Sequence, residues 1–229
     1  VEKHAKTGIA HRHLTPTLGI GDPDHTVSLL PAVAASSGLD VLSHALESYT
    51  AMPFNERPMP PRPLERPAYQ GSDPVGDIWA LTALELMAEF LPNAVADTSD
   101  FEAREKMLLA AALAGIGFGN AGVHLPHGMS YPVAGMVAGY IPPGYDVDHS
   151  MVPHGISVIL NTPAVVRFTA PASPERHLRA AAALVADIAR ASTEDAGEIL
   201  ADRVIHFMRV LDVPNGLSAV GYTTADIPG

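Results

Sequence analysis

The chain of 229 residues is long enough to bury a single core, and its 47% of hydrophobic residues is typical of a globular protein. Its formal net charge of −11 argues against a surface that binds nucleic acid or an anionic membrane. The absence of cysteine excludes thiolate metal ligands, cysteine nucleophiles and disulfides. No apolar run approaches the roughly 20 residues of a membrane-spanning helix, and no secretory signal is evident, so we expect a cytoplasmic protein.

Residues 1–27 have the pattern of two short extended segments, KTGIAHRHL and TLGIGDP, separated by a turn that contains proline. The pattern becomes helical after this point. We expect one helix to end at Gly38 and a second, LDVLSHALESYTA, to follow it with apolar residues at helical spacing. Asp40 and His44 lie beside that apolar stripe.

Residues 52–67 contain six prolines, too many for a helix or a central strand, so this segment is expected to be a long loop. It is either a surface insertion or a lid or oligomer contact. Four amphipathic helices are predicted after it, over residues 72–97, 101–122, 173–190 and 193–211. The first is expected to be capped by Ser72 or Asp73, and the third by Ser173. A mainly helical fold follows.

Four residues form a candidate set of metal ligands. They are Asp40 and His44 in GLDVLSHALE, His127 in LPHGMSYP and His154 in VPHGISVIL. Asp40 and His44 are four residues apart in a helical segment, so both side chains leave the same face. One carboxylate with three imidazoles suits iron(II) or zinc and leaves a position for a substrate oxygen or water. An isolated D-x-x-x-H pair is more often a helix cap with a buried histidine, but the two His-Gly segments favour a metal site.

With these three segments in order, the sequence resembles the iron-containing alcohol dehydrogenases, in which D-x-x-x-H is followed by HGM and then PHG. The resemblance covers essentially the whole chain. It is closest to the hydroxyacid-oxoacid transhydrogenase branch, through runs that include KTGIAHRHLTPTLGIGDPDHT, RPAYQGSDPVGDIW and GLSAVGYTTADIP.

The resemblance implies the helical C-terminal domain of the dehydroquinate synthase-like fold. Residues 1–27 would be remnant strands of a dinucleotide-binding domain that precedes them, and residues 28–229 an all-helical metal-binding domain truncated at both ends. The implied cofactors are Fe(II) or Zn(II), with NAD(H) or NADP(H) held mainly by the preceding domain. A homo-oligomer, with a dimer as the first expectation, and a mitochondrial location in an animal are also implied.

The activity implied by the resemblance is hydride transfer between an alcohol or hydroxy acid and a nicotinamide. In the transhydrogenase branch, 4-hydroxybutyrate would give succinate semialdehyde, with 2-oxoglutarate as acceptor through a cofactor that stays bound. The alternatives are a general NAD-dependent iron alcohol dehydrogenase and a fragment that binds metal but is catalytically silent alone. A metal-binding or interaction module without redox chemistry would leave the three ordered segments unexplained.

Other residues are assigned individually. Tyr131 stands where many family members carry a second histidine proposed as a proton relay, and it is a candidate for that role or a tyrosine packed at the cleft wall. His124 is expected beside the ligand His127, and His149 in an inserted loop over residues 139–150. Candidate partners for a substrate carboxylate are Arg12, Arg57, Arg62, Arg66 and Arg167. Histidines expected on surfaces, turns or helix exteriors, with no role, are His4, His11, His13, His25, His177 and His206.

Overall fold

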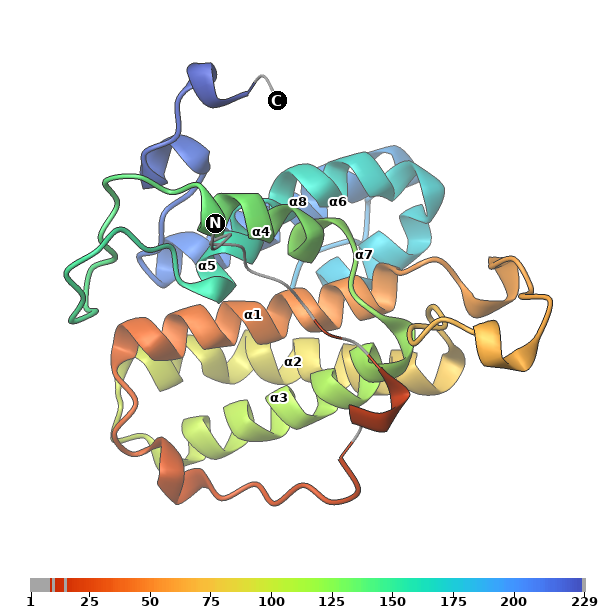
Figure 1. The fold of residues 1–229 in the computed structure, drawn as a ribbon, viewed down its shortest axis with the longest axis horizontal. Coiled ribbons are helices and arrows are strands. Elements are labelled where there is room, and N and C mark those ends of the chain that lie inside the picture. Colours follow the sequence, from red (N-terminus) through yellow and green to blue (C-terminus); the bar gives the residue numbers. More distant parts are fainter. Residues whose placement is uncertain (1–8, 10, 15, 228–229) are drawn as a thin grey trace, which may run out of the picture.

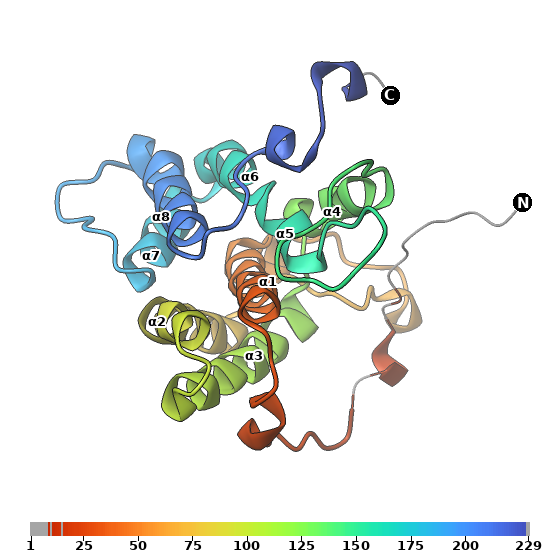
Figure 2. The ribbon, with the colours of Figure 1, turned by 90° about the vertical axis from the view of Figure 1, so that its left-hand side faces the viewer.

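Helix α1 (Pro31–Thr50) lies at the centre of the computed structural model, which describes residues 9, 11–14 and 16–227 (Figure 1). On one side it packs against the long helices α2 (Pro74–Ala96) and α3 (Phe101–Ala121), which also pack against each other. On the other side it contacts the short helix α5 (His154–Ile159). Figure 2 looks along α1 and shows it between these two groups of helices.

The remaining helices form the second group, most of which lies above α1 in Figure 1. They are α4 (Leu125–Gly135), α6 (Thr162–Thr169), α7 (Pro174–Ala183) and α8 (Ala196–Val210). Helix α4 packs on α5, while α8 packs on both α6 and α7. The predicted mainly helical fold is confirmed, and the described residues contain no strand.

The prediction that a helix ends at Gly38 is wrong, because α1 continues through it. A side chain at this position would collide with α2: a Cβ on Gly38 would lie 2.3 Å from Cδ1 of Leu91. The glycine therefore serves close packing between α1 and α2 rather than a helix end. Beside it, Leu39, Leu42 and Leu46 are almost fully buried and form the centre of the core.

Helices α2 and α3 follow the sequence prediction closely. Asp73, rather than Ser72, caps α2, because its Oδ1 accepts hydrogen bonds from the amides of Val75 and Gly76, each at 3.0 Å. Helix α3 ends at Gly122, which has the positive φ of 93° that favours glycine.

Three details of the second helix group differ from prediction. Helix α7 ends at Ala183 rather than near residue 190, because the chain turns at Val185, whose φ is +64°. The side chain of Ser173 does not cap α7; its oxygen lies 3.3 Å from Nδ1 of His177 instead. Helices α5 and α6 were not predicted. In α5, residues 155–159 are all buried, so no polar face alternates with an apolar one.

The described residues before α1 do not form the two predicted strands. Residues 12–14 and 23–26 form short 3-10 turns, and residues 16–22 have no regular structure. A strand needs a neighbour to pair its backbone groups, and none is present in the described part of the chain. The assignment of residues 1–27 to a separate dinucleotide-binding domain stays a prediction.

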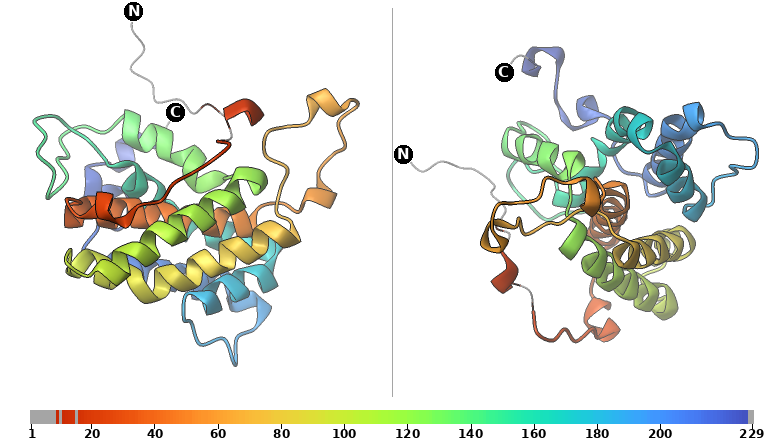
Figure 3. Two further views of the ribbon diagram at one scale, coloured as in Figure 1. Left: turned by 90° about the horizontal axis from the view of Figure 1, so that it is seen from below. Right: turned by 90° about the vertical axis from the view of Figure 1, so that its right-hand side faces the viewer.

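The two predicted loops are present and closed at their bases. The proline-rich loop returns to its start, since the amide of Phe54 donates to the carbonyl of Ser72 at 3.0 Å and the amide of Ser72 to that of Met52 at 3.1 Å. Figure 3 shows this loop projecting from the helices. In the inserted loop, the amide of Met151 donates to the carbonyl of Tyr140 at 2.9 Å.

Helix α2 corrects one expectation about membranes. By length and composition it could span a bilayer, although the sequence analysis found no such run. Helices α3 and α4 pass the same test only as a pair, across a bend of 105°. One face of α2 carries Ala80, Leu84 and Met87, all fully buried in the core, and the core helix of a soluble protein has the same composition.

Arg176 of α7 contacts both α1 and α2. Its guanidinium donates to the two carboxylate oxygens of Asp77 on α2, at 2.6 and 2.9 Å, and through Nε to the carbonyl of Tyr49 at 2.7 Å. It also lies 4.0 Å from the centre of the Tyr49 ring. Arg176 thus supplies a donor to a backbone carbonyl in the last turn of α1, and the sequence analysis did not single it out.

We expect Arg176→Met to destabilise the chain by roughly 1–3 kcal/mol, because it leaves a half-buried carboxylate and a helix-end carbonyl without their donor. The matched control is Arg179→Met, which removes an exposed arginine from the same helix. Urea denaturation measures both. Equal midpoints for the two variants would show that the Arg176 contacts contribute little.

Candidate metal centre

Three of the four predicted ligands converge on one point. Nε2 of His127 lies 3.3 Å from Oδ1 of Asp40, and Nε2 of His154 lies 3.7 Å from the same oxygen. The three ligand atoms all lie within 4.8 Å of one another. Oδ1 of Asp40 and Nε2 of His127 are buried and make no hydrogen bond within the described residues. Unsatisfied donor atoms that face one another in this way fit a cation between them.

His44 borders this group without joining it in the present geometry. Its Nδ1 is 3.8 Å from Oδ1 of Asp40. Its ring stacks on Phe118 at 4.3 Å and lies 4.4 Å from the ring of His127. The role of His44 as a fourth ligand therefore stays a prediction.

Gly155 brings the third ligand to the first. It follows His154 at the start of α5, where a Cβ would lie 1.8 Å from the carbonyl oxygen of Ser36 on α1 and 3.0 Å from Cβ of Asp40. The expected close approach beside a ligand is thus present here. It is absent beside His127, because a Cβ on Gly128 would have no atom within 4 Å.

Glu47 is part of the centre and was missed by the sequence analysis. It is 1% exposed, and its Oε1 lies 2.5 Å from Nδ1 of His127. Its Oε2 accepts a hydrogen bond from the backbone amide of His124 at 2.5 Å. A carboxylate on Nδ1 orients the ring so that Nε2 faces Asp40. The available signal was spacing, since Asp40, His44 and Glu47 recur on one face of α1.

The charges of the centre stabilise one another. Burial alone would lower the pKa of His127, but its close contact with the Asp40 carboxylate and its bond with Glu47 outweigh this and raise the pKa to about 9. Burial disfavours the Asp40 carboxylate, yet the contact with His127 and the charges of the nearby imidazoles hold its pKa below its usual value. Burial lowers the pKa of His44, against the opposing charge of Asp40. At neutral pH, the His127 imidazole of the metal-free protein is therefore protonated and positively charged.

The two further candidates lie at the start of α4 and on it, close in sequence to His127. His124 precedes α4, and its Nε2 lies 3.1 Å from Oγ1 of Thr50 while its amide contacts Glu47. Burial lowers the pKa of its imidazole. Tyr131 is half-buried on α4, four residues after His127. Its role in proton transfer stays a prediction.

Two of the five arginine candidates are engaged elsewhere. Arg167 pairs with Glu198 at 2.8 Å and Arg62 with Glu65. Arg57 is half-buried, and its Nε has no hydrogen-bond partner among the described residues. Arg66 is exposed, and the side chain of Arg12 is not described. Arg57 and Arg66 are therefore the described candidates whose guanidinium is not paired with a glutamate.

Among the other histidines, one expectation is wrong. His177 is fully buried, with Nε2 2.9 Å from Oγ1 of Thr169 and Nδ1 2.9 Å from the carbonyl of Ser173, and burial lowers its pKa. His149 lies exposed in the inserted loop, as expected. His4 lies outside the described residues.

Comparison with known proteins gives one family match and several similar sequences. The Fe-containing alcohol dehydrogenase family, C-terminal, matches residues 65–229. Hydroxyacid-oxoacid transhydrogenase, mitochondrial, from Xenopus tropicalis is 58% identical over 99% of this chain and 49% of that protein. The protein of the same name from Homo sapiens is 56% identical over 97% of this chain and 48% of its own. The chain therefore spans about half the length of the curated relatives it matches.

Solved structures of related sequence share the fold. An archaeal halo-thermophilic alcohol dehydrogenase from a Red Sea brine pool is 28% identical, with a TM-score of 0.78 over 98% of this chain and 49% of that one. A 1,3-propanediol oxidoreductase is 29% identical, with a TM-score of 0.72 over 90% of this chain and 46% of that one.

We expect Gly155→Ala to weaken zinc binding at least tenfold, because its methyl group would force α5 and His154 away from Asp40. Gly128→Ala is the control, since it changes the other His-Gly segment in open space and should bind zinc as the wild type does. Competition with a chromogenic chelator measures both affinities. Equal weakening in the two variants, or none in Gly155→Ala, would contradict the role given to the α1–α5 contact.

Proposed function

Because the chain belongs to the Fe-containing alcohol dehydrogenase family, we propose that it is the metal-binding half of an oxidoreductase that transfers hydride between a hydroxy acid or alcohol and a nicotinamide cofactor. The observation that carries this proposal is the convergence of Asp40, His127 and His154 with two unsatisfied buried ligand atoms. An open, mixed nitrogen and oxygen site of this kind suits catalysis rather than structure.

The residues of the centre have distinct roles in this proposal. Asp40, His127 and His154, with His44 as the fourth member, would hold Fe(II) or Zn(II), which when bound polarises a substrate oxygen and stabilises its negative charge. Glu47 would keep the Nδ1 proton of His127 in place, so that Nε2 is the nitrogen that loses its proton and binds the ion beside Asp40. Tyr131 is the candidate for carrying the substrate hydroxyl proton outward.

The identities favour the transhydrogenase branch. The chain is 58% identical to a hydroxyacid-oxoacid transhydrogenase but only 28% identical to the brine-pool alcohol dehydrogenase. We assign 4-hydroxybutyrate as donor, which loses a hydride from its carbinol carbon and a proton from its hydroxyl to give succinate semialdehyde. A nicotinamide bound by the complete enzyme would supply the hydride carrier between the two substrates, and 2-oxoglutarate would take up the hydride at its keto carbon together with a proton.

Two alternatives keep the same metal centre. The first is a general NAD-dependent iron alcohol dehydrogenase, in which the nicotinamide would exchange freely. The second is a chain that binds metal but has no turnover alone, because the nucleotide must be bound by another domain.

The relatives are named mitochondrial, which supports a mitochondrial location over the expected cytoplasmic one. A dimer and the absence of nucleic-acid and membrane partners stay predictions.

The metal centre is tested by loading the purified chain anaerobically with iron(II) or zinc. We expect about one ion per chain in the wild type and a sharp loss in His127→Ala, because that variant removes a ligand with a buried donor atom. His149→Ala, which removes an exposed loop histidine, is the control. An unchanged metal content in His127→Ala would refute the assigned site.

The pH dependence gives a second readout. Since metal-free His127 keeps its proton up to a pKa of about 9, binding must release that proton, and zinc affinity should rise by up to about tenfold per pH unit between pH 7 and 9. Glu47→Gln removes one of the bonds that raise this pKa and should shift the rise to lower pH. An affinity independent of pH in the wild type would contradict the protonated state.

The redox proposal is tested in a fusion of this chain with the N-terminal half of the Xenopus tropicalis relative. We expect 4-hydroxybutyrate and 2-oxoglutarate to react without added nicotinamide once the protein is loaded with metal. A strict need for added NAD would favour the general alcohol dehydrogenase. No turnover with either, from a fusion that holds metal, would contradict hydride transfer.

A further inference from the structure

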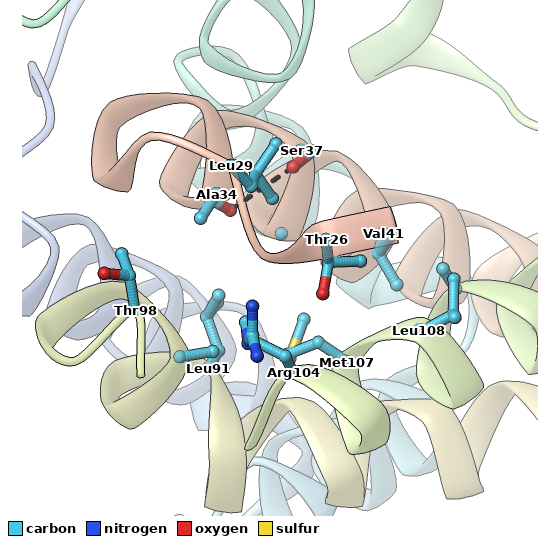
Figure 4. Close-up of a pocket in the computed structure, with 13 residues that line it drawn as sticks. Thr26, Leu29, Ala34, Ser37, Val41, Leu91, Thr98, Arg104, Met107 and Leu108 are labelled. Carbon is cyan, nitrogen blue, oxygen red and sulfur yellow. Dashed lines mark hydrogen bonds between the residues drawn. The ribbon is translucent and has the colours of Figure 1, made fainter. Parts of the chain in front are cut away.

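A cavity lies against a different face of α1 from the metal centre (Figure 4). Its volume is about 200 Å³, and it is a partly open pocket bordered by α1, α2, α3, the 3-10 turn Pro23–Thr26 and the segment that follows this turn. Its walls are almost wholly apolar, with Leu29, Val41 and Leu91 prominent among them. None of Asp40, His127 and His154 lines it, so the proposed hydride chemistry does not need it.

One cation faces this apolar space. Arg104 of α3 is 8% exposed, and its Nε and Nη1 are buried without a hydrogen bond in the described part of the chain. Figure 4 shows its guanidinium directed from α3 towards the segment that carries Leu29. The ring of Phe101 lies 5.9 Å from it. Hydrogen bonds from Ser99 to Oδ1 lower the pKa of Asp97, and the charge of Arg104 adds to this effect. No hydrogen bond joins Arg104 to Asp97 among the described residues.

A buried guanidinium without acceptors is costly, and its planar donors match a carboxylate in two parallel bonds. The rest of the pocket beside Arg104 offers almost no polar surface to a ligand. It is somewhat larger than a 150 Å³ cavity that holds benzene, so it fits a tail of about six to eight carbons. The ligand that satisfies both features has a single anionic head and a short apolar tail.

We propose that this cavity binds a medium-chain monocarboxylate, with the carboxylate on Arg104 and the tail between α1, α2 and α3. The carboxylate would accept one hydrogen bond from Nε or Nη1, which are buried without a partner among the described residues, and a second from Nη2, which shares a donor edge with each of them. The tail would replace empty space beside Leu91 and Met107.

Calorimetric titration of the purified chain with octanoate tests this site. We expect saturable binding with one site per chain, and at least tenfold weaker binding in Arg104→Met, which keeps the length of the side chain but loses its donors. Arg190→Met, at an exposed arginine, is the matched control and should bind as the wild type does. Octanol and acetate, which each lack one half of the proposed ligand, should bind at least tenfold more weakly than octanoate.

A second variant separates loss of the site from loss of the fold. Ala111→Leu fills the cavity from α3 without touching the charge and should also abolish octanoate binding, while metal binding by the chain remains. Arg104→Met should be at least as stable as the wild type, because it removes an unpaired buried charge. No octanoate binding, equal binding of octanol, or unchanged binding in Arg104→Met would each overturn the proposal.

Discussion

The contact between the backbone of α5 at Gly155 and the carbonyl of Ser36 on α1 fixes the distance on which the metal centre depends. Asp40 is on α1 and His154 begins α5, so the spacing of the two backbones sets the spacing of the two ligands. Helix α4 then adds His127 through its packing on α5. Three ligands far apart in sequence meet because one helix is approached closely by another.

The centre is also balanced in charge. Asp40 and Glu47 are two carboxylates in buried or half-buried positions, and together they match the charge of one divalent cation. Only Asp40 points its oxygen at the ligand group, while Glu47 acts through Nδ1 of His127. With a cation in the proposed site, one negative charge would lie on the ion, and the other would lie behind His127, where Glu47 orients the ring instead of competing for a coordination position.

Sequence patterns predicted the elements with local signals, such as the Asp73 cap of α2 and the Gly122 end of α3. They failed where the determinant lies in another segment. Gly38 has the local signature of a helix end, yet its role is set by Leu91, more than fifty positions away. Helix α5 lacks a polar face because it is buried all round, and Arg176 acts on partners in α1 and α2 that no local pattern reveals. Three short motifs predicted the candidate ligands, and the structure brings Asp40, His127 and His154 together, but the position of His44 shows that motifs do not determine how each ring is turned.

The open space at Gly128 makes the centre accessible to spectroscopy. The chain contains no cysteine, so Gly128→Cys would introduce a single thiol that can be labelled selectively, directly beside the ligand His127. Position 128 is exposed on α4, and a side chain placed there would not displace a neighbouring side chain. A spin label or fluorophore there would report occupation of the candidate site from the residue next to one of its proposed ligands.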